Sequence, residues 1–485
     1  EPSIRGLASA GFSASVNLTP ELQRFENLEL AIGAQPLKGR IERESRSGQG
    51  ASLSIDLAGE GLDLDAARAI AALVVGEDAE QRLLAERVAT RLKVDALRAF
   101  GVTAEDVEAI ATYEAGQLSI ERLNFGSIAG SAVRVSGNFR DTESRPVGEA
   151  QISFVSADPE PFLALLRERL PNSPLVDRLA ESAAWYQNSD LRATLALPSS
   201  GAVGLDMSGR VNKSAISLKA GAADLIALMA GGKRRFDIRL ENEEAQILLG
   251  QLGFDPLPWT IGDGGVATLT LDAEDDGRAE AALNFAGPGT TLDAGWQLTD
   301  FYTPDLLDGA WEVSGESQDL GPYLMALGLN LPEAGTGVPA SGEARFSLAK
   351  GQVALESLEG RLADQTISAA GQVDLTATVP VATGSVRLEQ LDLDWLAESV
   401  VGPLRNPATG DLSAEPLSAL GLPFDLNLDW TVGRLWLGLG EAMTEVSGKL
   451  RNKAGELALE EMAGNWFGGK ATGRFSVANS DGNGF

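Results

Sequence analysis

The sequence predicts a mainly β protein, built as an elongated array of antiparallel strands with one short α-helix per repeat. Two observations predict this class: apolar and polar residues alternate in short runs from end to end, and strand groups are separated at regular intervals by helical patterns. A third, the recurrence of one glycine-led strand motif, indicates internal repetition rather than a single globule.

The alternating runs predict strands with one apolar and one polar face. Typical runs are Leu53, Ile55, Leu57 and Phe236, Ile238, Leu240, each separated by polar or small residues. Fully buried parallel strands would be continuously apolar, so the pattern favours an antiparallel sheet with one solvated side. Glycines between the runs, such as Gly277 and Gly351, suit the turns.

Each predicted helix begins after an Asp or Asn that is suited to cap it. These residues recur every 75 to 93 positions, at Asp65, Asp158, Asn242, Asp319 and Asp394. Pro171 and Pro174 should break the second helical stretch in two, and residues 77–92 should form a further helical cluster.

A second repeat appears in the strand motif itself. AGQLSIERL at 115–123, KGQVALESL at 350–358 and AGELALEEM at 454–462 share one pattern, a turn glycine followed by an alternating strand. We therefore expect an array over residues 1–402 with units of roughly 1–76, 77–188, 189–256, 257–330 and 331–402. A proline-rich linker should follow at 403–423, and a terminal repeat at 424–485.

Composition excludes several classes of function. The 485 residues carry a formal charge of −30, which opposes binding to nucleic acid. The chain has no cysteine and no histidine, so thiol nucleophiles, disulfides, imidazole metal ligands and Ser-His catalysis are all excluded. No apolar run approaches the roughly 20 residues that a membrane-spanning helix needs.

Two acidic motifs have a structural and a chemical interpretation. LDLD occurs at 62–65 and again at 391–394, where helix capping is favoured over a metal site because each copy ends a strand and opens a helix. The acidic run at 272–276 lacks the ligand spacing and glycine of a calcium-binding EF-hand loop, which favours a solvated turn.

The strand-and-helix repeat, together with the segment FDLNLDWTVGRLWLGLGEAMTEVSGKLRNKAGELALEEMAGNWFGGKATGRF at 424–475, resembles the AsmA-like family, whose members include the TamB and YhdP relatives. The "VSG" turn, "GELALEEM" strand, "FGG" turn and "ATGRF" strand carry the resemblance, and residues 108–139 look like a second copy. The resemblance implies a repeating β-groove: a long, twisted sheet curled so that its concave apolar side shields lipid acyl chains. The family's amino-terminal membrane helix has no counterpart here.

A physical argument supports a groove, since an apolar sheet face has to be covered by another layer, by helices or by something else apolar. The predicted helices are too few and too short to cover such a sheet. The residues expected to line the groove are Leu118, Ile120, Val353, Leu355, Ile367, Phe424, Leu426, Leu428, Leu457 and Leu459. The alternation alone favours an ordinary sandwich core over a lipid-binding groove, and the family resemblance reverses that preference.

The function expected from these observations is non-catalytic lipid handling in the periplasm of a Gram-negative cell, in support of phospholipid transport and outer-membrane biogenesis. The expected partners are phospholipid acyl chains, with inner- and outer-membrane proteins at the ends of the full-length protein, and no cofactor or metal is expected. We expect an inner-membrane anchor in a segment outside this sequence. The alternatives are a structural or adhesive β-repeat protein with a dry core and, less favoured, a carboxylate-based polysaccharide enzyme.

Overall fold

The computed structural model describes residues 10–478 except 33–34, 47–49, 67–85, 143, 171–173, 225–226, 228–231, 254–263, 300–307, 327–336, 364, 397–423, 439 and 454–455. Over these residues the protein is mainly β, and its strands belong to one open, curled 25-stranded sheet. The predicted fold class is thereby confirmed. The chain divides into two compact units, residues 1–238 and 239–485, which are described in turn.

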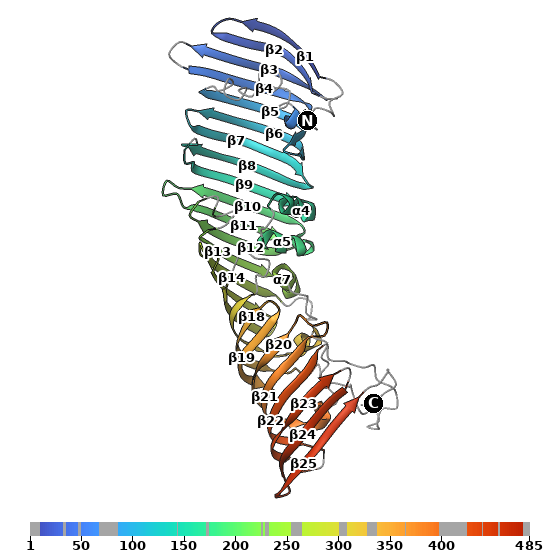
Figure 1. Cartoon of the computed structure of the whole chain (residues 1–485). Coiled ribbons are helices and arrows are strands. Elements are labelled where there is room, and N and C mark those ends of the chain that lie inside the picture. Colours follow the sequence, from blue (N-terminus) through green and yellow to red (C-terminus); the bar gives the residue numbers. More distant parts are fainter. Residues whose placement is uncertain are drawn as a thin grey trace. The chain divides into compact units, whose positions relative to one another are not determined.

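Unit 1 is a run of strands that pair with their neighbours in sequence (Figure 1). Its strands are β1 (Ala10–Leu18), β2 (Leu22–Ile32), β3 (Gln35–Arg46), β4 (Gly50–Asp63), β5 (Arg87–Ala99), β6 (Val102–Glu114), β7 (Gln117–Ile128), β8 (Ser131–Arg140), β9 (Val147–Ser156), β10 (Ser189–Leu197), β11 (Val203–Val211) and β12 (Ser214–Ala222). The next strand, β13 (Arg234–Asn242), contains the boundary between the units.

Unit 2 repeats this arrangement. Its strands are β14 (Gly265–Ala273), β15 (Ala279–Gly287), β16 (Thr290–Leu298), β17 (Gly309–Ser317), β18 (Ala340–Ala349), β19 (Gln352–Leu362), β20 (Gln365–Asp374), β21 (Val381–Asp392), β22 (Asp425–Trp436), β23 (Met443–Lys453), β24 (Glu456–Trp466) and β25 (Gly469–Ala478).

Three of the five predicted capping residues lie directly before helices. Among the described residues, the helices with defined bounds are α4 (Glu160–Arg169), α5 (Pro174–Glu181), the 3-10 turn η1 (Ala183–Tyr186), α7 (Ala245–Leu252) and α8 (Gly321–Ala326). Asp158, Asn242 and Asp319 each accept a backbone N–H at the start of α4, α7 and α8. In unit 1, Phe162 of α4 packs on Phe154 of β9 with ring centroids 5.0 Å apart, so α4 covers part of one sheet face.

Two details of the prediction were wrong. Residues 87–92 belong to β5 and not to a helix, because Val88, Leu92 and Val94 follow the two-residue period of a paired strand. The sheet is also not wholly antiparallel: β4 pairs with β5, and β21 with β22, in parallel. Both parallel pairs are joined by connections longer than the dozen residues that such a crossover requires. The start of the predicted helical cluster, 77–85, and the predicted linker, 403–423, lie outside the described residues.

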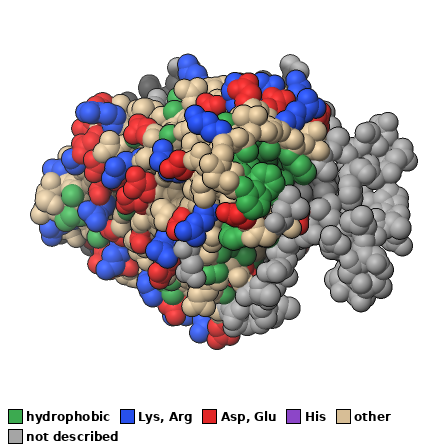
Figure 2. All heavy atoms as spheres, turned by 90° about the horizontal axis from the view of Figure 1, so that it is seen from below, with side chains coloured by type: hydrophobic (Ala, Val, Ile, Leu, Met, Phe, Trp, Pro, Cys, Tyr) green, Lys and Arg blue, Asp and Glu red, His purple; other side chains and the backbone are tan. Residues whose placement is uncertain are grey.

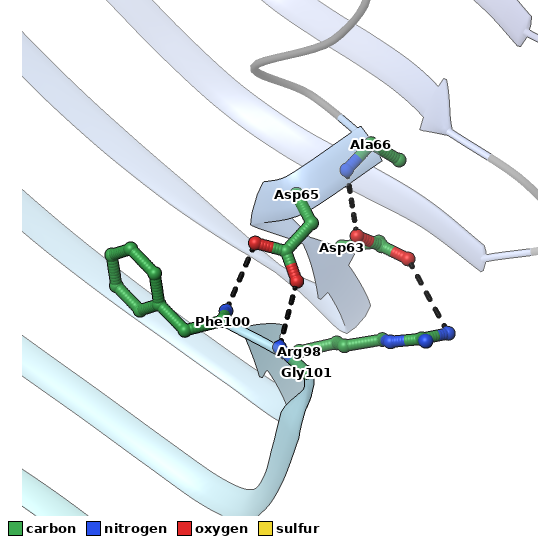
Figure 3. A network of polar contacts seen from close by, with 6 residues as sticks. All are labelled: Asp63, Asp65, Ala66, Arg98, Phe100 and Gly101. Atoms are coloured by element: carbon green, nitrogen blue, oxygen red, sulfur yellow. Dashed lines mark hydrogen bonds and ion pairs between the residues drawn. The ribbon is translucent and has the colours of Figure 1, made fainter. Parts of the chain in front are cut away.

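Both parallel crossovers begin with an LDLD motif. Ala66 N–H donates to Asp63 Oδ1 at 2.8 Å, and Trp395 N–H donates to Asp392 Oδ1 at 3.2 Å. Capping is therefore confirmed, although the first Asp of each motif provides it and not Asp65 or Asp394. In the first motif, the Asp65 carboxylate instead accepts N–H bonds from the β5–β6 turn (Figure 3).

Candidate functional site

The candidate site is the apolar face of the sheet, which strand pairing defines residue by residue. Paired residues on neighbouring strands point to the same face, so a line of partners traces one row across the sheet. In unit 1 one such row runs through Leu28, Gly39, Leu57, Leu92, Ala109, Leu123, Val135, Ile152, Ala193, Met207 and Leu218. The row crosses β2 to β12 without a polar side chain.

A second row of unit 1 lies beside the first and has the same character. It runs through Leu30, Leu37, Gly59, Val94, Val107, Phe125, Val133, Phe154, Leu191, Gly209 and Ile216. We call the face that carries these two rows the apolar face of unit 1.

Unit 2 has an apolar face of its own. One row crosses β14 to β25 through Leu271, Ala281, Trp296, Trp311, Phe346, Leu355, Gly371, Gly384, Leu428, Leu450, Leu459 and Phe475. A second row on the same face, separated from the first by one intervening row, runs through Phe285, Leu292, Gly315, Gly342, Gly360, Ile367, Leu388, Val432 and Val446. These rows define the apolar face of unit 2.

The opposite face is polar. In unit 1 a row on that side reads Lys93, Glu108, Asn124, Arg134, Ser153, Arg192, Ser208 and Ser217. Arg122 and Glu108 form an exposed ion pair there at 2.9 Å, of a kind that contributes about 1 kcal/mol or less. Figure 2, a view from below that of Figure 1, shows acidic and basic side chains intermingled over much of the coloured surface; hydrophobic side chains form one larger patch and several smaller ones.

Nine of the ten residues predicted to line the groove lie within strands of these units. Leu118 and Ile120 belong to β7, Val353 and Leu355 to β19, Ile367 to β20, Leu426 and Leu428 to β22, and Leu457 and Leu459 to β24, whereas Phe424 immediately precedes β22. Eight of the ten are half-buried. Leu457 and Leu459 are each only 1% exposed.

The low exposure of Leu459 follows from a closed core at one part of unit 2. Leu459 packs in a cluster with Trp430, Leu435, Met443 and other residues of β21 to β24. Trp395 and Leu396, which begin the crossover after β21, pack against the same cluster. The apolar face of unit 2 is therefore covered by protein here, and half-buried at β19 and β20.

Two further features of the apolar face of unit 2 were not predicted from the sequence. Trp296 stacks on Trp311 with centroids 4.7 Å apart, and Trp311 on Phe346 at 5.7 Å, which makes an aromatic ladder across β16 to β18. In the second row of this face, three consecutive strands carry glycine, at Gly315, Gly342 and Gly360. The sequence pattern that could have predicted this row is a glycine at a strand position where the alternation predicts an apolar side chain, as at Gly342 in GEARF.

The acidic candidates have structural roles. Around the acidic run, Glu274 N–H donates to Arg278 O at 2.8 Å, which closes a turn, and hydrogen bonds from Arg278 hold the pKa of the exposed Asp276 carboxyl below its ordinary value. Over the part of the chain that the structure describes, no three acidic side chains group closely enough to hold a metal ion.

Comparisons with protein-family models, with curated proteins and with solved structures give no match. Among the described residues there is no helix of the length and apolarity that crossing a membrane requires.

Proposed function

We propose that this chain is a non-catalytic lipid-handling protein whose apolar sheet faces shield the acyl chains of phospholipids. The observation that carries the proposal is the unbroken apolar rows, which cross β2 to β12 in unit 1 and β14 to β25 in unit 2. These rows contain no polar side chain over many strands. They therefore present a hydrocarbon-like surface that runs across the sheet, perpendicular to the strands.

The energetics favour acyl chains as the ligand. Each methylene group removed from water contributes about 0.8 kcal/mol, so a chain laid along such a row gains affinity from its length. The exposed charges lie on the other face, where ion pairs such as Lys38–Glu29 and Lys449–Glu461 occur. Because such a face contacts the acyl chains and not the headgroup, it should bind phospholipids with different headgroups with similar affinity.

The wider setting is part of the same proposal. The resemblance of residues 424–475 to the AsmA-like family supports a place in the periplasm of a Gram-negative cell, where the protein would assist phospholipid transport between the inner and outer membranes. An anchor in the inner membrane and protein partners at both membranes belong to the full-length protein in this proposal.

Site-specific photo-crosslinking in cells tests lipid contact directly. Neighbouring residues on one strand point to opposite faces, so each strand supplies its own matched control. A benzoylphenylalanine at Ile120 or Val353 should capture phospholipid, and the same group at the exposed Ser119 or Gln352 should not. Equal capture at both members of each pair, or capture at neither, would contradict the proposal.

The second candidate function is a structural or adhesive β-repeat protein with a dry interior. The closed cluster around Trp430 and Leu459 favours it, because that part of the apolar face is already covered by protein. Native mass spectrometry of the purified chain separates the two functions: retained phospholipid supports lipid handling, and a consistently lipid-free protein supports the structural role.

A further inference from the structure

A hollow in the apolar face of unit 2 has a floor made of bare backbone. Gly315, Gly342 and Gly360 pair in one line across β17, β18 and β19, so three neighbouring strands present no side chain at the same level. Leu292 on β16 and Ile367 on β20 continue this line on either side and form the end walls. We call this space the glycine hollow.

Close strand approach requires these glycines. A Cβ at Gly342 would lie 2.7 Å from the carbonyl oxygen of Glu359, and one at Gly360 would lie 2.5 Å from that of Ser341. Both distances are too short for any other residue unless the backbone moves. The floor is therefore fixed by the packing of the strands.

The hollow has the size of a small-ligand site. Its volume is about 670 Å³, within the roughly 300–1,000 Å³ typical of such pockets. Leu320, which directly precedes α8, and Tyr323 of α8 also line it, and Leu358 contributes from the adjacent row. Its exposed wall is almost entirely apolar.

These properties select the occupant. A stable protein partner buries on the order of 800 Å² on each side, far more than this hollow offers. A polar or charged ligand would lose its hydration without gaining hydrogen bonds from an apolar wall. A linear hydrocarbon chain fits, because the glycine line runs across the strands and so in the direction of the apolar rows.

We propose that the glycine hollow is a fixed binding site for one hydrocarbon chain of a lipid, so that lipid stays preferentially at β16 to β20 and is not spread evenly over the apolar face. This inference rests on the proposed lipid-handling function. It adds to that function a preferred resting place, formed by the three glycines and closed at one side by α8.

Photolabelling of the whole purified chain tests the site. The probe is palmitic acid with a diazirine at its terminal carbon, and labelled peptides are identified by mass spectrometry. At low probe concentration, label should concentrate on peptides containing Leu292, Leu358 or Ile367. Label spread evenly over both units would overturn the fixed site and leave lipid handling intact, whereas no label anywhere would overturn both.

A filling substitution gives an independent readout. Ala344 is half-buried on the wall of the hollow, between Val313 and Leu358, and the Ala344→Trp substitution should fill the hollow. The matched control is Ala193→Trp, at a half-buried position on the apolar face of unit 1. Ala344→Trp should weaken probe binding about tenfold, the change expected when about two methylene groups lose their contacts, and the control should not. Circular dichroism checks that both variants fold. Should Ala344→Trp misfold, the label distribution of the unmodified chain still decides. Unchanged binding in a folded Ala344→Trp protein contradicts the site.

Discussion

Asp65 and Phe100 lie 35 residues apart in sequence, yet the Phe100 N–H donates a 2.9 Å hydrogen bond to Asp65 Oδ1. The Gly101 N–H donates to the other carboxylate oxygen at 3.0 Å (Figure 3). One carboxylate thereby ties the β5–β6 turn to the point where the chain leaves β4, the parallel partner of β5. A parallel crossover has no tight turn to fix its register, and this contact supplies one constraint of that kind.

Asp65→Ala should destabilise unit 1 by about 1–3 kcal/mol, because two backbone N–H groups lose a charged acceptor. Urea denaturation measures the loss, and hydrogen exchange should accelerate at the Phe100 and Gly101 amides. Asp65→Asn keeps one acceptor oxygen and should fall between the wild type and Asp65→Ala. Unchanged exchange at both amides in Asp65→Ala would show that the contact does not hold the turn.

Gly209→Ala should be destabilising, while Gly204→Ala on the same strand should be tolerated. A Cβ at Gly209 would collide with the carbonyl oxygen of Asp190 on β10, whereas a Cβ at Gly204 meets nothing within 4 Å. Overpacking of this kind costs about 1–3 kcal/mol. Thermal or urea unfolding of the two variants provides the comparison, and equal stabilities would mean that the strands at Gly209 separate without cost.

Leu459→Ala and Leu118→Ala should separate stability from lipid capture. Leu459 is 1% exposed in the closed cluster, so its truncation should cost about 2–5 kcal/mol. Leu118 is half-buried, so its truncation should cost less than about 1.5 kcal/mol but reduce the phospholipid retained in native mass spectrometry. A larger loss of stability in Leu118→Ala than in Leu459→Ala would contradict the closed core around Leu459.

Tyr186 makes the fold sensitive to alkali. Burial raises the pKa of the Tyr186 phenol from 10.0 to about 12, and the nearby Arg178 charge partly opposes this shift. A raised folded-state pKa favours the protonated form, so this contribution is complete below pH 10 and is lost as the pH rises from 10 to about 12.

Spectrophotometric titration of Tyr186→Phe tests that assignment. The difference in phenolate absorbance between wild type and variant should titrate near 12, the value for Tyr186, if the protein stays folded. A difference curve centred near 10 instead would mean that the Tyr186 phenol is exposed to water. Wild type should also lose more stability than the variant between pH 10 and 12.

The sequence by itself determined the strands, the two-sidedness of the sheet and the positions where helices begin. These features depend on local rules: alternation sets which side chains share a face, and a short Asp or Asn side chain caps the helix that follows it. For that reason nine of the ten residues chosen from the sequence lie in strands, and the second helical stretch breaks between α4 and α5 as Pro171 and Pro174 predict.

Only the tertiary structure decided which strands pair and what covers their apolar face. The parallel pairs β4–β5 and β21–β22, the line of Gly315, Gly342 and Gly360, and the stack of Trp296 on Trp311 all depend on register between strands. The alternation that makes Leu355 half-buried is the same one that makes Leu459 fully buried. Their difference comes from residues distant in sequence, since burial depends on what packs above a strand and local periodicity contains no record of that.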